Sequence, residues 1–299
     1  MGKTVSSCIK VKKYKFASGK TRGEVVFFIC ASIFLGIIAS TYVFAYLWGV
    51  LAGMKSHDEI ILRPFTLPEN WSNIRNYIDV FSMLEVRGVK FFGMIENTLM
   101  LVLVGPLLAI GGSSILAYIV AKYRFPGRNL LISINVVVIS LPIIGGTAAT
   151  YRLFSRLGMI NSPLLLLNFI GNFGANFLYM LSCFNNTSSA YMEAARIDGA
   201  GHYSIMFKIM LPLAMPMMSA LWILSLISVW NDVHMPLLFW NRRPTLATGI
   251  YLFNLEMTYR ARMDILMAAV IISSIPPLIL FAIFHNKILS NVTFGGIKG

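Results

Sequence analysis

The hydrophobic residues of this chain gather in long windows that are almost free of Lys, Arg, Asp and Glu. A helix needs about 20 apolar residues to cross a bilayer core of about 30 Å. Six windows reach this length: Val25–Gly53, Asn97–Ala121, Asn129–Tyr151, a stretch within Pro163–Phe184, Pro212–Trp240 with Asp232 as its one charged residue, and Ile265–Asn286. We therefore predict six transmembrane helices in an all-α polytopic membrane protein.

The composition excludes an ordinary soluble enzyme. Of the 299 residues, 57% are hydrophobic and 12% are charged, whereas soluble chains carry about 25% charged residues. The net charge of +13 would suggest nucleic acid on a soluble protein, but on a membrane protein it more often reflects basic cytoplasmic loops. We expect no nucleic-acid partner. Cys8, Cys30 and Cys183 show no metal-binding or redox spacing.

The distribution of Lys and Arg predicts that both termini lie in the cytoplasm. The tail 1–24 carries seven basic residues and one acid, Glu24. With this tail inside, the inner segments together hold fourteen basic and three acidic residues. The outer segments hold eleven basic and seven acidic residues when Glu96 is left at the boundary. The domain organisation is a basic tail (1–24), a six-span transmembrane domain (25–286) with outer segments 54–96 and 241–264, and a C-terminal tail (287–299).

The inner segment 185–211 is predicted to form a helix–turn–helix. Tyr191–Ile197 has helical character, Asp198-Gly199 is typical of a turn because glycine readily adopts a left-handed backbone, and Ser204–Leu211 reads as a second helix. We expect Pro212 to end that helix at the membrane. An apolar-faced helical hairpin suits a groove on another protein, although a connector lying on lipid headgroups fits the pattern equally well.

Segment 185–211 resembles the coupling loop of ABC-importer permease subunits, which carries the "EAA…G…LP" motif, and it is called the coupling loop from here on. The matching residues are Glu193, Ala194, Ala195, Asp198, Gly199, Leu211 and Pro212. Asn97-Thr98-Leu99 and Trp230-Asn231-Asp232 resemble further segments of the family, and the likeness covers about residues 55–299. It is nearest to the second permease of maltose-type carbohydrate importers. Ser188 departs from the pattern, because the family usually has proline five residues before the motif glutamate.

The resemblance implies a type I ABC-importer permease fold in a bacterial plasma (inner) membrane. It implies that the coupling loop docks into a cytoplasmic ATPase, with Glu193 facing a basic residue of that partner. It further implies two ATPase subunits, a second permease subunit in a heterodimer, and an extracytoplasmic solute-binding protein reached by the outer loop Asn241–Asp264. No cofactor is expected in this chain, because ATP and Mg would bind the partner ATPase.

Polar residues within the apolar windows are candidates for the solute path. Asn168, Asn172 and Asn176 are spaced to share one face of a single helix, and they would either line the path or hydrogen-bond neighbouring helices. Trp230, Asn231 and Asp232 are the second candidate group. The outer loop contains four arginines, which extend the hypothesis to anionic sugars such as uronates. They are Arg242, Arg243, Arg260 and Arg262.

Three classes of function remain to be compared. The first is ATP-driven import of an oligosaccharide or related carbohydrate. A non-sugar polar solute, such as a polyol or glycerol phosphate, is the alternative substrate of such an importer. The second is an ion-coupled secondary transporter, which would need several intramembrane charges and an internal repeat, whereas Asp232 is the one acid within the predicted spans. The third is a membrane enzyme. No phosphate-binding glycine loop, Ser/His/Asp set or metal cluster supports catalysis by this chain.

Overall fold

The computed structural model describes residues 22–141, 146–170, 173–256 and 262–292. Its contacts divide the chain into two units, 1–49 and 50–299. The elements in chain order are α1 Arg22–Ala52, α2 His57–Leu62, the 3₁₀ helix η1 Trp71–Arg75, α3 Asn76–Met83, β1 Glu85–Val86, β2 Val89–Lys90, α4 Phe91–Lys122, α5 Arg128–Ser140, α6 Gly146–Arg156, the 3₁₀ helix η2 Pro163–Phe169, α7 Ala175–Asn186, α8 Ala190–Ile197, α9 His202–Ile205, the π turn η3 Met206–Met210, α10 Leu211–Trp230, α11 His234–Phe239, α12 Leu246–Glu256 and α13 Met263–Val292.

Helices dominate both units. In the first, α1 is apolar from Val25 onward and is long enough to cross a membrane. In the second, the described residues hold three further helical stretches of that kind, Phe91–Lys122, His202–Trp230 and Met263–His285. β1 and β2 form a short antiparallel hairpin that pairs Glu85 with Lys90. The prediction of a helical membrane protein is therefore confirmed, with four clearly spanning helices.

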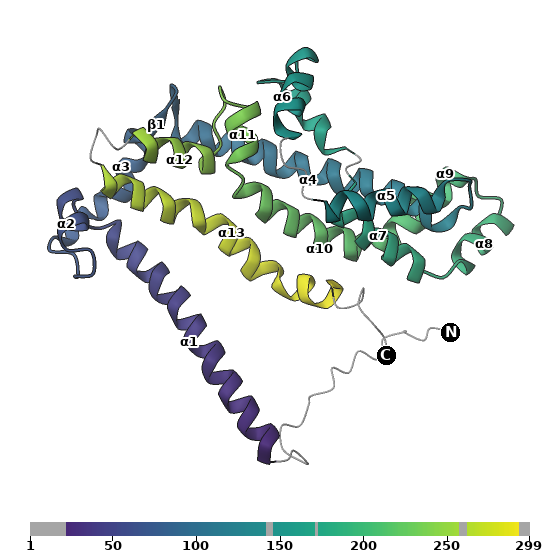
Figure 1. The fold of residues 1–299 in the computed structure, drawn as a ribbon, viewed down its shortest axis with the longest axis horizontal. Helices are drawn as coiled ribbons and strands as arrows, with labels where there is room; N and C mark the ends of the chain where they lie inside the picture. Colours follow the sequence, from purple (N-terminus) through teal and green to yellow (C-terminus); the bar gives the residue numbers. More distant parts are fainter. Residues whose placement is uncertain (1–21, 142–145, 171–172, 257–261, 293–299) are drawn as a thin grey trace, which may run out of the picture. The chain divides into compact units, whose positions relative to one another are not determined.

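The packing of the second unit is built on α4, α7, α10 and α13 (Figure 1). α4 contacts both α7 and α10, and α10 also contacts α13. One apolar cluster joins α4, α7 and α10 to α8 and α9, with Tyr118, Phe177, Phe184 and Met210 fully buried. A second cluster joins α3, α12 and α13 to the other halves of α4 and α10. α4 and α10 therefore contribute side chains to both apolar clusters.

The third and fourth predicted spans are wrong as single helices. Asn129–Tyr151 is interrupted after Ser140, where Leu141 takes an extended backbone (φ −90°, ψ 120°). Leu141 precedes Pro142, and proline disfavours the helical conformation of the residue before it. Within Pro163–Phe184, η2 ends before Ile170 and α7 begins after Gly174, both of which are extended. A long apolar window can therefore contain a break in its helix, and hydrophobic composition alone does not reveal that break.

The fifth predicted span has different ends. Its helix begins at His202, ten residues before Pro212, and stops at Trp230 rather than at Trp240. Asp232 consequently lies in the turn between α10 and α11 and not inside a helix. Its Oδ1 accepts hydrogen bonds from the backbone N–H groups of His234 (2.9 Å) and Met235 (3.2 Å). A carboxylate fits the start of α11 because the first amides of a helix have no internal acceptor.

Candidate functional site

The turn of the coupling loop is a complete helix C-cap. The N–H of Gly199 donates to the carbonyl of Arg196 (3.0 Å), and the N–H of Ala200 donates to that of Ala195 (2.9 Å). These two bonds define a Schellman motif, which needs a left-handed residue at its centre. Gly199 supplies it with φ +76°. The helix expected over Tyr191–Ile197 and the turn at Asp198-Gly199 are both present.

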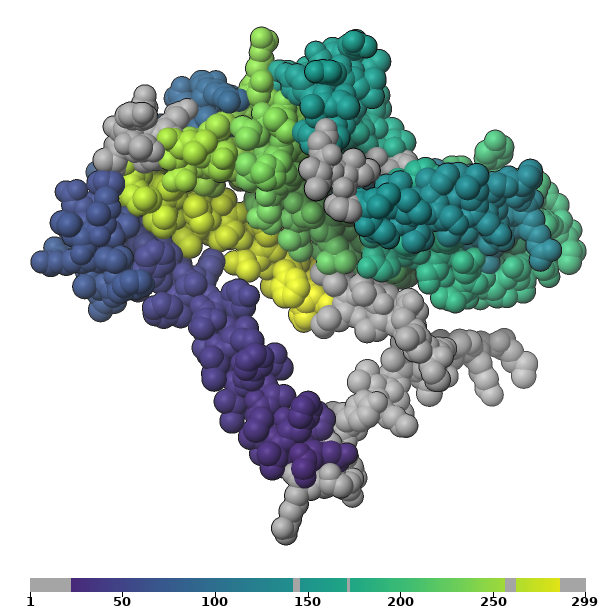
Figure 2. All heavy atoms as spheres, in the orientation of Figure 1, coloured from purple at the N-terminus to yellow at the C-terminus, as the bar shows by residue number. Residues whose placement is uncertain are grey.

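The coupling loop buries one face and exposes the other. Met192 and Ala195 enter the apolar cluster beneath α8, whereas Glu193, Ala194 and Arg196 are exposed. Beside the turn, Ile197 is 86% exposed and Tyr203 is 81% exposed. In Figure 2 the loop forms one edge of the second unit. Exposed apolar side chains next to the exposed carboxylates of Glu193 and Asp198 are typical of a protein-docking surface.

Polar contacts fix the loop to the end of α4. Lys122 Nζ donates to the carbonyl of Thr187 (2.6 Å), just before α8. The hydroxyl of Tyr123 lies 3.0 Å from Nδ1 of His202, at the start of α9. Both ends of the α8 segment are therefore held to the end of α4.

Pro212 does not end the second helix of the loop, contrary to expectation. α9, η3 and α10 form one continuous helical run from His202 to Trp230. The π turn η3 precedes the proline, and the N–H of Leu211 bonds the carbonyl of Met206, five residues back. A proline ring clashes with the carbonyl four residues earlier. We attribute the continuity to the wider turn, which separates the ring of Pro212 from that carbonyl.

A polar cavity of about 290 Å³ lies farther along the same helical run. It is lined by Pro106, Ala109, Ser113, Phe169, Phe173, Gly174, Ala175, Asn176, Ser225, Ser228 and Val229. Nδ2 of Asn176 on α7 donates to Oγ of Ser225 on α10 at 3.4 Å. Three hydroxyls and an amide among apolar walls suit a neutral polar solute that needs several hydrogen bonds.

The predicted asparagine stripe does not exist as one helix face. Asn168 lies in η2 and Asn176 in α7, with the extended Ile170 and Gly174 between them. The extended backbone at Gly174 interrupts the helix on which the spacing argument depends. Asn172 lies outside the described residues. Among the predicted path residues that the structure describes, Asn176 alone lines the cavity.

The second candidate group supports the fold of the outer end. Trp230 is 5% exposed, and its Nε1 donates to the carbonyl of Ser273 (3.1 Å) on α13. Nδ2 of the exposed Asn231 donates to the carbonyl of Ile227 (2.9 Å) within its own helix. With Asp232 capping α11, the three residues terminate α10 and attach it to its neighbours.

Sequence reasoning missed the serines of the cavity. Ser225 and Ser228 are three residues apart on α10, which places them on one helix face, and Ser113 on α4 is buried. Hydroxyls at helical spacing within an apolar window were the available signal. Thr98 was also missed as a structural residue. Its Oγ1 accepts from the N–H of Leu246 (2.8 Å) and joins α4 to the start of α12.

Among the four predicted arginines, the backbone of Arg242 and the side chain of Arg262 have structural partners. The N–H of Arg242 donates to Oδ1 of Asn161 (2.9 Å). Arg262 forms two bonds of 3.0 Å to the carboxylate of Asp264, and this hydrogen bonding raises the pKa of its guanidinium. Arg260 lies outside the described residues. Within the described ranges, no three His, Cys, Asp or Glu side chains are close enough to hold a metal ion.

Comparison with known proteins gives a consistent result. Residues 113–293 match the family model described as "Binding-protein-dependent transport system inner membrane component". The chain is 27% identical over 258 residues to the diacetylchitobiose uptake system permease of Streptomyces coelicolor, covering 84% of this chain and 83% of that protein. It is 28% identical to the trehalose/maltose transport system permease of Thermococcus litoralis, covering 92% and 97%.

A further relative and a solved structure agree with this match. The sulfoquinovosyl glycerol transport system permease of Agrobacterium fabrum is 27% identical, with 93% of this chain and 95% of that protein covered. A crystal structure of a bacterial ABC transporter that imports the acidic polysaccharide alginate contains a chain with a TM-score of 0.69 and 21% identity. The likeness covers 90% of this chain and 99% of that one, and it shows that the two share a fold.

Proposed function

Because the chain belongs to the family of binding-protein-dependent transport system inner membrane components, and is a permease subunit rather than an enzyme, we propose that its solute is an oligosaccharide or related carbohydrate. Three relatives transport diacetylchitobiose, trehalose or maltose, and sulfoquinovosyl glycerol. The cavity formed by Ser113, Asn176, Ser225 and Ser228 offers donors and acceptors for sugar hydroxyls. Family membership decides against an ion-coupled transporter and a membrane enzyme.

One observation carries the proposed mechanism: the coupling loop and the cavity share a continuous helical run. His202, where the run begins, is a residue of the coupling loop, and Ser225 and Ser228 near the end of the run line the cavity. A displacement of the loop is therefore transmitted along α10 to the solute-binding wall. ATP-driven movement of a partner docked on the loop would open and close the cavity by alternating access.

The proposed complex contains several partners. Two cytoplasmic ATPase subunits bind ATP and Mg, and one of them docks on the coupling loop with a basic residue facing Glu193. A second permease subunit, in a heterodimer, completes the solute path. An extracytoplasmic solute-binding protein meets the outer loop 241–264. The exposed carboxylate of Glu193 and the exposed Ile197 support the docking step.

We further propose that both termini are cytoplasmic and that the chain crosses a bacterial inner membrane six times. Four long helices supply spans. The two remaining crossings would use the broken segments α5–α6 and η2–α7. Irregular backbone is tolerated at membrane depth where it lies within protein or lines a cavity, and residues 169 and 173–176 do line the polar cavity.

The decisive variant for this function is Glu193→Arg. It reverses a charge on an exposed side chain, so folding and membrane insertion should be preserved. We expect ATP-driven carbohydrate uptake by the assembled transporter to fall at least tenfold, because two like charges would meet at the ATPase surface. The measurement is initial uptake rate in proteoliposomes, together with the amount of ATPase retained on the purified complex.

Glu85→Arg is the matched control. Glu85 is also exposed, but it lies on the β1–β2 hairpin, remote in the chain from the coupling loop. Glu85→Arg should leave the amount of ATPase retained on the purified complex unchanged. Wild-type uptake and retention in Glu193→Arg would overturn the docking role of this residue.

A further inference from the structure

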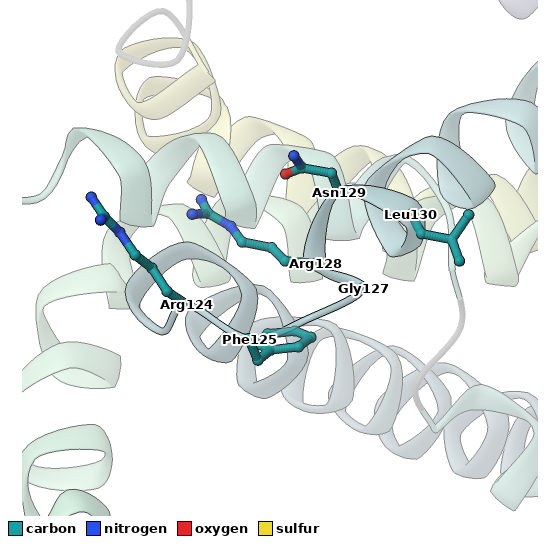
Figure 3. Close-up of a pocket in the computed structure, with 6 residues that line it drawn as sticks. All are labelled: Arg124, Phe125, Gly127, Arg128, Asn129 and Leu130. Carbon is teal, nitrogen blue, oxygen red and sulfur yellow. The ribbon is translucent and has the colours of Figure 1, made fainter.

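A second pocket lies in the loop that connects α4 to α5. The chain leaves α4 at Lys122 and enters α5 at Arg128 through Tyr-Arg-Phe-Pro-Gly. The pocket has a volume of about 380 Å³. Its lining residues are Arg124, Phe125, Gly127, Arg128, Asn129 and Leu130 (Figure 3). Neither the coupling loop nor the solute cavity includes any of these residues.

The pocket is positively charged and lacks a protein counter-ion. In Figure 3 the guanidinium groups of Arg124 and Arg128 and the amide of Asn129 point to the same side of the loop. Within the described ranges, no carboxylate lies within ion-pair distance of either arginine. The segments 1–21 and 293–299 contain no Asp or Glu.

Arg128 also has a buried donor without an acceptor. Its Nε is shielded from solvent and forms no hydrogen bond to any described residue. Leaving a buried charged donor unsatisfied is costly, so a ligand with acceptor oxygens would be stabilised there. A planar guanidinium matches the oxygen geometry of a phosphate particularly well.

The backbone adds to this preference. Gly127 has φ +89° and precedes α5, which runs for 13 residues and has no side-chain cap at its start. The first amides of a helix carry unsatisfied N–H groups and the positive end of the helix dipole. The N–H of Arg128 already donates to the carbonyl of Phe125 (3.3 Å), so the following amides of α5 and the two guanidinium groups are the donors at this pocket.

The surroundings indicate a lipid rather than a dissolved anion. Leu130 is 63% exposed and points away from the two guanidinium groups in Figure 3. Farther along α5, Val137 and Leu141 are more than half exposed. The loop joins two apolar helices, so it lies where a bilayer ends. A molecule with a phosphate and acyl chains would satisfy both the basic pocket and the apolar face of α5.

We propose that this pocket binds the phosphate headgroup of an anionic glycerophospholipid. The site goes beyond solute import, because none of its residues lines the solute cavity or belongs to the coupling loop. Arg124 and Arg128 bind the phosphate oxygens, the amides of the first turn of α5 assist them, and the acyl chains follow α5. Inorganic phosphate shares the headgroup chemistry but lacks the apolar contact.

The test is the affinity of the purified transporter complex for phosphatidylglycerol, measured by native mass spectrometry with phosphatidylcholine as the neutral reference. A basic residue near a membrane surface contributes about fivefold to the binding of an anionic lipid. We expect Arg124→Gln and Arg128→Gln each to weaken phosphatidylglycerol binding about fivefold, with no change for phosphatidylcholine. Arg128→Lys should give an intermediate loss, because it keeps the charge without the planar fork.

Arg242→Gln combined with Arg243→Gln is the control, since it removes two positive charges from the outer loop. The proposal is overturned if the double variant at Arg124 and Arg128 binds phosphatidylglycerol like the wild type, or if the control loses as much affinity. Competition by inorganic phosphate as effective as that by the lipid would contradict a lipid site and indicate a simple anion site. Arg124 is exposed, so Arg124→Gln alone decides the matter if Arg128→Gln does not fold.

Discussion

A single glycine determines the shape of the coupling loop. Gly199 adopts φ +76° at the centre of the Schellman motif, with open space where a side chain would lie. Alanine there fits sterically with its neighbours but imposes a left-handed strain of roughly 1–2 kcal/mol. We expect Gly199→Ala to weaken binding of the ATPase subunit by up to about tenfold, measured as the dissociation constant of the ATPase from the solubilised permease.

Gly88 offers a close control for this substitution. It has φ +77° and equally open surroundings, but it lies in the turn between β1 and β2. Gly88→Ala carries the same backbone strain, so it should cost similar stability while leaving ATPase affinity unchanged. Equal loss of affinity in the two variants would show that general destabilisation, rather than the loop, is responsible.

Asn176 is the residue that best tests the solute cavity. It is the polar side chain of α7 that lines the cavity and bonds Ser225. Asn176→Leu removes one hydrogen bond, worth about 1 kcal/mol. We expect the apparent KM for carbohydrate uptake to rise roughly fivefold with little change in ATPase retention. Tyr179→Leu, at an exposed position of α7 that does not line the cavity, is the control, and equal KM values in both variants would remove Asn176 from the path.

At the scale of elements, the sequence predicted helices well where hydrophobicity and backbone geometry agree. The helices α4 and α13 contain the windows Asn97–Ala121 and Ile265–Asn286 that were chosen from composition. The prediction failed at Leu141 and around Gly174, where proline and glycine break the backbone while the side chains remain apolar. Helix ends marked by a local motif, such as Gly199, were predictable because the signal lies within a few residues.

The cavity and the long helical run were not predictable in this way. The cavity brings together Ser113, Asn176 and Ser225 from three helices, and no local pattern states which helices will be neighbours. The run through Pro212 was missed because proline normally breaks a helix interior. Its continuity depends on the π turn η3, which has no simple signal in the sequence.

The π turn gives a prediction about transmission. Pro212→Ala restores a backbone N–H that can bond the carbonyl of Lys208, so an ordinary α turn becomes available. Removing the extra residue of a π turn would rotate the coupling loop by about 100° relative to α10. Because alanine favours a helix more than proline does, we expect unchanged or higher thermal stability together with a severalfold fall in ATP-driven uptake.

Pro216→Ala is the corresponding control. Pro216 lies one turn farther along α10, beyond η3, so replacing it should leave the register of the loop intact. A Pro212→Ala transporter that retains wild-type uptake would show that the π turn has no part in coupling.

At the scale of the whole molecule, the coupling loop and the solute cavity lie one after the other along a single helical run. The exposed face of the coupling loop lies at one end of the helical run, and the polar cavity lies farther along it. The basic residues predict that the loop end is cytoplasmic, where an ATPase would meet it. Two acidic residues lie at opposite ends of this helical run. Glu193 is exposed in the coupling loop, whereas Asp232 caps α11 at the far end of α10.

The most direct test of this account is carbohydrate uptake into proteoliposomes that contain the purified permease pair, with the ATPase and the solute-binding protein added or omitted. We predict accumulation of sugar only when ATP, the ATPase and the loaded binding protein are all present. Sugar accumulation by vesicles that contain the permease pair without any ATPase would contradict the central claim that this chain is an ATP-driven import subunit.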